Sequence, residues 1–283
     1  MAIDTTFLRE LDKLNLLINK RVTSNYIGQK KSIAVGKGLI FKDHRIYAPG
    51  DDVKNIDWKV FARTDDYFIK NYEEERNVAV HIILDISNSM DYGKNISKYE
   101  YGAMLALGFA YLAVKGNEKV QFSTFSDEIE IFHPNRGFSQ VGSMIRHLNE
   151  VKPKGNSMID SCFKKYRHAI GSKSIMIIIS DFLMDTTEIE KATFALGKQE
   201  LKFVQVLDPV EKNLAIEGEY DLEDSETGLK LKSFISPRTR NHFQVELDRH
   251  VGKVHEMVEA LGGQFFQFTT DTSPFQAFHD MLR

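Results

Sequence analysis

The sequence predicts an α/β protein with a doubly wound, mainly parallel sheet, a small N-terminal irregular or β appendage and a β-hairpin insertion. From residue 78 onward, short apolar runs alternate with longer helical patterns, as in parallel sheets covered by helices on both faces. Residues 22–77 instead scatter Gly, Asp and aromatic residues among few periodic runs. Residues 214–236 suggest two short strands around a polar turn at 224–228. We therefore assign 1–76 to the N-terminal helix and appendage, and 77–283 to the α/β domain with its hairpin insertion at 214–236.

Composition excludes several classes of function. The 283 residues carry a formal net charge of −3, which gives no reason to expect a nucleic-acid partner. The single cysteine, Cys162, excludes an internal disulfide framework and suits a reducing cytoplasm. The first 20 residues are charged throughout, and no run approaches the roughly 20 apolar residues that cross a bilayer. We expect a cytoplasmic chain without direct membrane insertion.

The first elements follow from apolar periodicity. Apolar residues at helical spacing predict an amphipathic helix over 4–19. Residues 78–84 are apolar and rich in β-branched side chains, as in a strand buried on both faces. The helix expected at 98–115 is apolar almost all round and should be buried. Two short strands follow at 119–125 and 129–132, around a turn.

The second half continues the alternation of helices and strands. A Pro/Gly loop at 153–156 separates two of its helices. The predicted helices are 138–150, one starting near Ser157, 186–198, 237–261 and a short one at the end, and the strands are 174–180, 201–207 and 264–269.

The strand at 78–84 leads into Asp85, Ser87 and Ser89, which are spaced D-x-S-x-S. Open α/β sheets bind their ligands at the carboxyl ends of the strands, where this loop should lie. One carboxylate and two hydroxyls form a hard, all-oxygen set that suits a magnesium-class ion. A serine-rich loop that only caps the next helix is the alternative.

This loop resembles the metal-ion-dependent adhesion site of von Willebrand factor A domains. In that pattern a later Gly-rich loop supplies a hydroxyl, usually from Thr, and a later strand end supplies an Asp. Ser157 and Asp181 occupy those places in that order, with Ser in place of Thr. The resemblance implies that Asp85, Ser87, Ser89, Ser157 and Asp181 hold Mg²⁺, or Mn²⁺ or Ca²⁺. It leaves one coordination position for water or an incoming carboxylate.

Two further considerations bear on this site. Asp85 and Asp181 at neighbouring strand ends would repel each other without a cation, which favours an ion. Asp160, one turn after Ser157, is interpreted either as an outer group that orients a ligand or as an ordinary acid in the first turn of a helix. A set of caps and turn residues that binds no ion remains the alternative for the whole constellation.

A second motif precedes the strand, with the pattern R-x-Y-x-P-G-D-D-x-x-x-I-D-W-x-x-x-A-R. Its candidate residues are Arg45, Tyr47, Gly50, Asp51, Asp52, Asp57, Trp58 and Arg63. This block, followed by the metal motif, is similar to the bacterial family called domain of unknown function 58, over about residues 35–275. The family resemblance implies work beside MoxR-type AAA+ ATPases in folding, assembling or activating client proteins.

The residues of the block suggest how it folds. Pro49-Gly50 predicts a tight turn, because Pro presets φ and Gly accepts positive φ. The Asp and Arg side chains can form a charge network, and Trp58 can anchor the segment to the core. A lock onto the α/β domain and a partner-binding surface are both open interpretations.

We expect a protein-interaction module that is not an enzyme, captures an acidic side chain of a client through the ion and works with a MoxR-type ATPase. The alternative is a metal-dependent hydrolase or phosphatase that uses Asp85 and Asp181. In the dehalogenase class of phosphatases the general acid stands two residues after the nucleophile, where this chain has Ser87. We also expect no His, Cys or Lys near these loops to replace that acid. A scaffold with a vestigial site is a third hypothesis.

Overall fold

A computed structural model describes residues 6–12, 35–36, 40–73, 79–132, 137–171, 174–214, 216–223, 225 and 228–282. The chain forms two compact units, one of residues 17–77 and one of residues 1–16 with 78–283. The units meet between residues 77 and 78, and residues 6–12 group with the α/β unit. They do so because Leu11 is fully buried and the Asp12 carboxylate accepts a hydrogen bond from the Tyr111 hydroxyl (2.6 Å).

The α/β unit is built on a six-stranded sheet in the order β11-β8-β7-β4-β5-β6. Every neighbouring pair is parallel except β5 and β6. The strands are β4 (Ala79–Asp85), β5 (Lys119–Phe125), β6 (Ile129–Ile131), β7 (Ser174–Ser180), β8 (Glu200–Leu207) and β11 (Gln264–Thr269). This order, with the chain reversing direction beside β4, is the doubly wound arrangement. The predicted fold class is confirmed.

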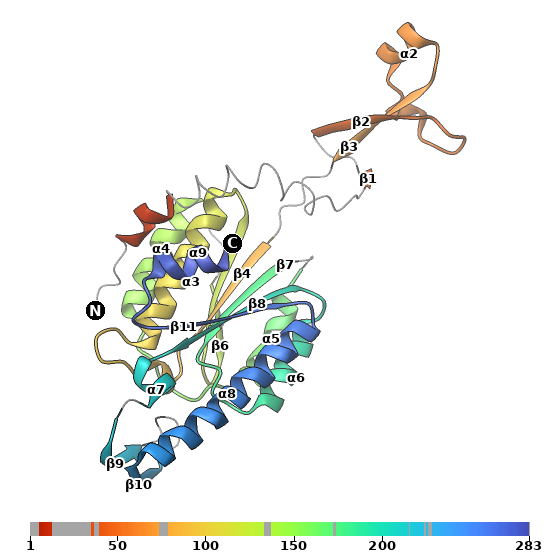
Figure 1. Ribbon diagram of the computed structural model, residues 1–283. Coiled ribbons are helices and arrows are strands. Elements are labelled where there is room, and N and C mark those ends of the chain that lie inside the picture. Colours follow the sequence, from red (N-terminus) through yellow and green to blue (C-terminus); the bar gives the residue numbers. More distant parts are fainter. Residues whose placement is uncertain are drawn as a thin grey trace. The chain divides into compact units, whose positions relative to one another are not determined.

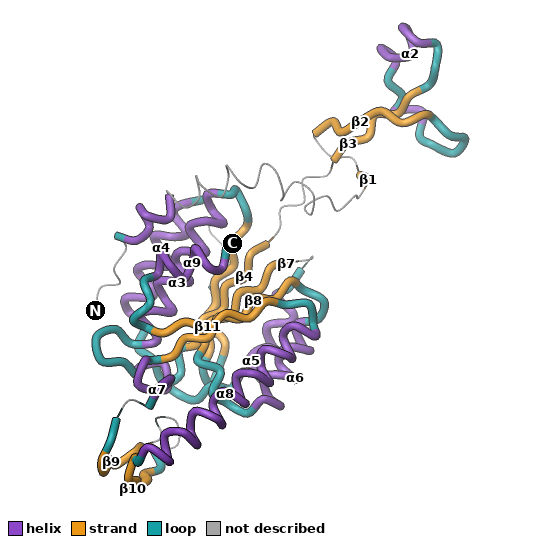
Figure 2. Tube along the Cα trace, in the orientation of Figure 1, coloured by secondary structure: helices purple, strands orange, loops and turns teal. Residues whose placement is uncertain are grey.

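Helices cover both faces of this sheet, with α3, α4 and α9 on one side and α5, α6 and α8 on the other (Figures 1 and 2). They are α3 (Lys98–Lys115), α4 (Phe138–Glu150), α5 (Ile159–Tyr166), α6 (Thr186–Leu196), α8 (Pro237–Ala260) and α9 (Pro274–Met281), with a short α7 (Pro209–Asn213) before the hairpin. Burial follows the sequence pattern, since β4 and β7 are almost entirely buried and most of α3 is buried as well. The long apolar runs therefore form the centre of the domain.

Most element bounds match the predicted ones to within one or two residues. The short helices α2 (Trp58–Thr64) and α7 were not predicted, because their ends are specified by caps and their lengths are too small for a periodic pattern. Asp208 and Glu211 form a capping box at α7. The predicted N-terminal helix is described only at residues 7–12, and the rest of 4–19 lies outside the described residues.

The appendage unit is a small antiparallel sheet in the order β1-β3-β2. Its elements are β1 (Val35–Gly36), β2 (Ile40–Ile46), β3 (Phe68–Glu73), the 3-10 helix η2 (Val53–Asn55) and α2. Ile56 and Ile69 face each other across an antiparallel bridge and are both buried. These two side chains give the unit a minimal core, in agreement with the predicted irregular β appendage.

The expected insertion is an antiparallel hairpin of β9 (Gly218–Glu223) and β10 (Lys230–Ile235). Residues 224, 226 and 227 of its predicted turn lie outside the described residues. Within the described part of the chain, no helix is long and apolar enough to cross a membrane.

Candidate metal site

The Asp85 carboxylate lies fully buried at the carboxyl end of β4, between β5 and β7. Its Oδ2 accepts hydrogen bonds from the hydroxyls of Ser157 (2.8 Å) and Ser180 (2.7 Å). Its Oδ1 accepts the backbone N–H of Ser87 (2.8 Å). Both carboxylate oxygens are therefore engaged, and the two strands and two loops around them are held together through one side chain.

The serine loop and the loop before α5 are joined by backbone hydrogen bonds. Asn88 N–H donates to the Gly155 carbonyl (2.9 Å), and Lys154 N–H donates to the Ile86 carbonyl (2.7 Å). The Ser87 and Ser89 hydroxyl oxygens lie 3.1 Å apart. The oxygens of Asp85, Ser87, Ser89 and Ser157 are thus gathered by strand and loop backbone.

Gly155 allows the second loop to take this path. Its φ of +80° is in the left-handed region, and a side-chain methyl group there would collide with the carboxylate of Asp127. That carboxylate accepts the backbone N–H of Asn156 (3.0 Å), next to Ser157. The glycine and Asp127 therefore set the position of the Ser157 hydroxyl together.

Asp181 follows β7 and has a partner that the sequence did not predict. Its Oδ2 lies 2.8 Å from the ammonium nitrogen of Lys98, a fully buried side chain in the first turn of α3. The same ammonium lies 2.7 Å from Glu211 Oε1 in α7. The expectation that no lysine lies near these loops is wrong, because α3 begins beside the strand ends and turns Lys98 inward. A cation already compensates Asp181, which weakens the repulsion argument for an ion.

The electrostatics of the cluster follow from burial and charge. Burial and the nearby charge of Asp181 raise the pKa of Asp85 to about 6, against the opposing hydrogen bonds from Ser180 and Ser87. Burial alone would lower the pKa of Lys98, but the attraction of Asp181 and Glu211 outweighs it and raises that pKa. Ionisation of Asp85 is therefore less favourable than for an ordinary aspartate, whereas the positive form of Lys98 is favoured.

Asp160 lies in the first turn of α5, where its Oδ2 pairs with Lys164 at 2.7 Å. Its Oδ1 is buried and has no hydrogen-bond partner among the described residues. The ion pair is the contact expected of an ordinary helix acid. The interpretation of Asp160 as an outer group of the site stays a prediction.

The donor atoms of the five residues are all oxygens. Two carboxylates and three hydroxyls match the oxygen preference of Mg²⁺, and Asp181 keeps one oxygen that Lys98 does not occupy. The described residues contain no group of three or more His, Cys, Asp or Glu placed to hold a metal. The residues thus fit a magnesium-class ion that relies on hydroxyls and retained water, and do not fit zinc or copper.

The rim of this buried cluster is apolar and exposed. Tyr92 follows the serine loop, Met158 follows Ser157, and Leu183 follows Asp181, with exposed fractions of 46%, 47% and 42%. We call these three residues the apolar rim. All three follow residues of the buried cluster in the sequence, on three different loops.

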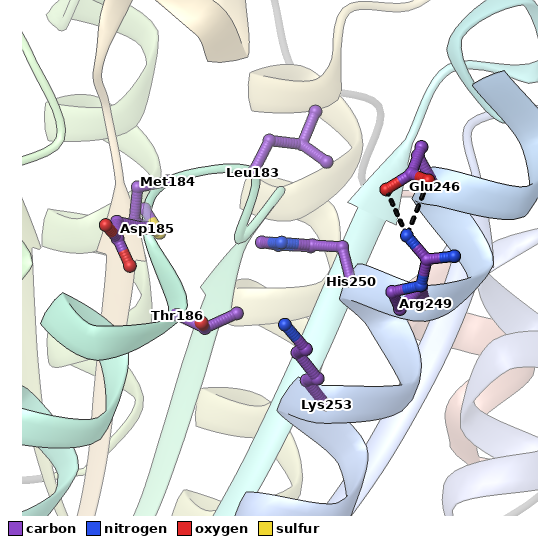
Figure 3. A pocket seen from close by; sticks show the side chains of 8 residues that line it. All are labelled: Leu183, Met184, Asp185, Thr186, Glu246, Arg249, His250 and Lys253. Atoms are coloured by element: carbon purple, nitrogen blue, oxygen red, sulfur yellow. Dashed lines mark hydrogen bonds and ion pairs between the residues drawn. The ribbon is translucent and has the colours of Figure 1, made fainter. Parts of the chain in front are cut away.

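Polar hollows adjoin the loops on two sides. One, of about 350 Å³, lies between the Leu183–Thr186 turn and the side chains of Arg249, His250 and Lys253 on α8 (Figure 3). His250 Nε2 lies 2.6 Å from the carbonyl oxygen of Phe182, so α8 supports the turn that carries Asp181. A second hollow of about 290 Å³ extends from Asp91 to Pro153.

The N-terminal block contains two separate ion-pair clusters. Arg45 binds both oxygens of Asp51 (2.6 and 2.7 Å), and Ala48 N–H also donates to Asp51 (2.9 Å). Asp57 accepts from His44 (2.9 Å) and pairs with Lys70 (3.4 Å), while its other oxygen caps α2 through Lys59 N–H. The charged residues of the motif therefore fix the turn and the helix start within this unit.

The other residues of the block have local roles or remain exposed. Asp52 caps η2 by accepting from Lys54 N–H (3.0 Å), and Gly50 takes a φ of +108° after Pro49. Tyr47 packs edge-on against Tyr67, while Arg63 is exposed in the last turn of α2. Trp58 is 58% exposed within its unit and packs edge-on against Phe61. Its proposed anchoring to the core stays a prediction.

Sequence reasoning missed Lys98, Ser180 and Glu211. Ser180 lay next to a predicted ligand, and its position before Asp181 at a strand end was a usable signal. Lys98 stood in a mostly apolar helix that was predicted to be buried, which also marks it as a lysine in need of a partner. Glu211 carried no signal, because its contact with Lys98 spans 113 residues.

The sheet order with its antiparallel edge strand, together with the oxygen-rich loops at the strand ends, defines a von Willebrand A-like α/β protein. The model of a protein family of unknown function, DUF58, matches residues 43–253. The chain belongs to the DUF58 family.

Relatives and solved structures resemble the chain at low identity. The uncharacterized proteins Rv1480 of Mycobacterium tuberculosis and Mb1516 of Mycobacterium bovis are each 23% identical over 273 residues, 95% of this chain and 86% of the relative. An aerotolerance-related membrane protein from Bacteroides fragilis is 19% identical, with a TM-score of 0.47 over 72% of this chain and 98% of that one. The ArnB paralog VWA2 from Sulfolobus acidocaldarius is 12% identical, with a TM-score of 0.39 over 73% and 44%. The fold assignment rests on this chain's own sheet.

The substitution Gly155→Ala should destabilise the protein by about 1–3 kcal/mol, because a left-handed residue gains a side chain that meets Asp127. Gly142→Ala is the matched control, since Gly142 lies inside α4 with open space around it. That change should stabilise by about 0.5–1 kcal/mol. Denaturant unfolding measures both, and equal effects of the two substitutions would contradict the role assigned to Gly155.

Arg45 and the N–H of Ala48 lower the pKa of Asp51 to about 2. This ion pair should therefore favour the folded unit above about pH 4 and lose its effect as the pH falls toward 2. A carboxyl-detected NMR titration should find that Arg45→Met returns the Asp51 pKa toward its ordinary value. Lys54→Met makes the same change in charge and is the control. An Asp51 pKa that is unchanged in Arg45→Met would refute the pairing of Arg45 with Asp51.

Proposed function

We propose that this chain is a metal-ion-dependent protein-interaction module that is not itself an enzyme. The observation that carries this proposal is the apolar rim of Tyr92, Met158 and Leu183 around a buried cluster of oxygen donors. An apolar rim around a polar centre suits a flat protein partner better than a small substrate, because proteins bury such side chains on association.

In this proposal Asp85, Ser87, Ser89, Ser157 and Asp181 hold Mg²⁺, with Mn²⁺ or Ca²⁺ as substitutes. Magnesium keeps several exchangeable ligands, so a partner's Asp or Glu can complete the coordination. The partner then gains one directional bond from its carboxylate and buries apolar area against the rim. The raised pKa of Asp85 supports the ion, since a bound cation would favour the ionised carboxylate.

We further propose that the partner is a MoxR-type AAA+ ATPase, a client protein of such an ATPase, or both. Membership of the DUF58 family supports this, because the family resemblance implies work beside such ATPases. The proposed compartment is the cytoplasm, because the partner ATPase requires the ATP that is present there. In this arrangement the ATPase supplies energy, while the rim and the ion select the client.

A hydrolase that uses Asp85 and Asp181 is the second candidate, and Lys98 is the observation that favours it. A lysine beside a strand-end aspartate can stabilise negative charge on a reacting group. However, Asp85 and Lys98 are both fully buried, and both oxygens of Asp85 already accept hydrogen bonds. A nucleophile must be reachable, so the contacts support this candidate less. Phosphoester turnover that Asp85→Asn abolishes would establish it.

Magnesium or manganese at millimolar concentration should raise the melting temperature of the protein, and Asp85→Asn should abolish that rise. A ligand at a hundred times its Kd stabilises the folded state by about 2.7 kcal/mol. Each kcal/mol raises the melting temperature of a domain of this size by about 2–4 °C. Asp160→Asn is the control and should keep the rise if Asp160 is an ordinary helix acid. The absence of any rise in the unmodified protein would refute the ion.

The substitution Leu183→Glu should reduce co-purification with a MoxR-type ATPase or its client at least about tenfold, because a charge replaces buried apolar contact. The metal-dependent rise in melting temperature should persist. Phe194→Glu is the control, since Phe194 is similarly exposed at the opposite end of α6. Equal binding by the two variants would exclude the rim as the partner surface.

A further inference from the structure

We propose that Lys98 is a built-in cation that competes with the divalent ion for Asp181 and sets the affinity of the site for metal. This inference rests on the proposed function, because it concerns the same site. It explains how a cluster of buried carboxylates remains compatible with a folded, metal-free protein.

The position of Lys98 is fixed by its helix. Ser97 caps α3 in a reciprocal capping box with Glu100, so Lys98 is the first helical residue and its backbone cannot drift. The side chain is fully buried, and its ammonium nitrogen lies between Asp181 Oδ2 (2.8 Å) and Glu211 Oε1 (2.7 Å). A lysine buried this deeply is rare unless it is paired, and both of its partners are carboxylates.

The charge of Lys98 must act on any ion bound nearby. Like charges that lie a few ångströms apart repel each other strongly where water is excluded, so an ammonium in contact with a ligand carboxylate opposes a second cation. Burial keeps this effect from being screened by salt. The same contact stabilises the metal-free state, because it compensates Asp181 when no ion is present.

Glu211 gives the ammonium a second place to bind. Its other carboxylate oxygen accepts the backbone N–H of Asp208 (3.1 Å), which holds Glu211 in position at the start of α7. When an ion takes Asp181, Lys98 can keep its contact with Glu211 without leaving the site. Glu211 therefore lowers the energy needed to displace Lys98 and favours metal binding.

The test is direct binding of Mn²⁺, measured by electron paramagnetic resonance of free manganese and by titration calorimetry on the full chain. Lys98→Met should bind Mn²⁺ at least about tenfold more tightly than the unmodified protein. Lys154→Met is the matched control, because Lys154 belongs to the loop that carries Ser157 but has an exposed side chain. It makes the same change in net charge and should change the affinity less than threefold.

The substitution Glu211→Gln provides a variant with the opposite sign. It removes the second place for the ammonium and leaves Lys98 less compensated, so Mn²⁺ should bind more weakly than to the unmodified protein. If Lys98→Met does not fold without metal, Glu211→Gln decides alone. Recovery of folded Lys98→Met by added Mn²⁺ would also support the inference.

The possible results separate this inference from the proposed function. If the unmodified protein binds Mn²⁺ and Lys98→Met binds it equally well or more weakly, the role of Lys98 is overturned while the ion site stands. Unchanged or tighter binding in Glu211→Gln would overturn it as well. Binding to Lys98→Met alone would support the competition by Lys98 but would refute a bound ion in the unmodified protein. The absence of binding in the unmodified protein, Lys98→Met and Glu211→Gln would overturn both proposals.

Discussion

The buried carboxylate of Asp85 is the constraint on which the strand-end face depends. A charged group removed from water needs compensation, and this one receives it from two hydroxyls and a backbone N–H on three different segments. Those bonds require the serine loop, the Ser157 loop and the end of β7 to meet at one point. The hydrogen bonds to Asp85 therefore hold the surrounding loops in place and determine the shape of the face that these loops form.

The sheet could be predicted because its strands are specified locally. Residues 174–180 and 264–269 form strands within those bounds, since each apolar run is flanked by turn residues that stop it. The same reasoning failed for α2 and α7, which are too short to show a period and begin directly after their capping residues Asp57 and Asp208. Capping residues specify where a helix begins, but only tertiary packing decides whether so short a helix forms.

The candidate site was predictable where its residues follow strands and hidden where they come from helices. Asp85 and Asp181 could be placed together because parallel strands end at the same edge. Lys98 could not, since an N-terminal helical position gives no direction for its side chain until the helix is packed on the sheet. The ion pair of Lys98 with Asp181 thus depends on the packing of α3 against β4, which no local pattern encodes.

The presence of Lys98 alters what an ion would do at this face. In a site without an internal cation, the stability of the fold depends on metal binding, because neighbouring carboxylates repel each other when no ion is bound. Here Lys98 pairs with Asp181, and three hydrogen bonds reach Asp85, so an ion is not the sole compensation for these carboxylates. Under the proposed function, a bound ion would serve recognition, and an incoming carboxylate would add negative charge that favours its retention. Binding of metal and binding of partner should therefore be thermodynamically coupled, since each raises the affinity for the other.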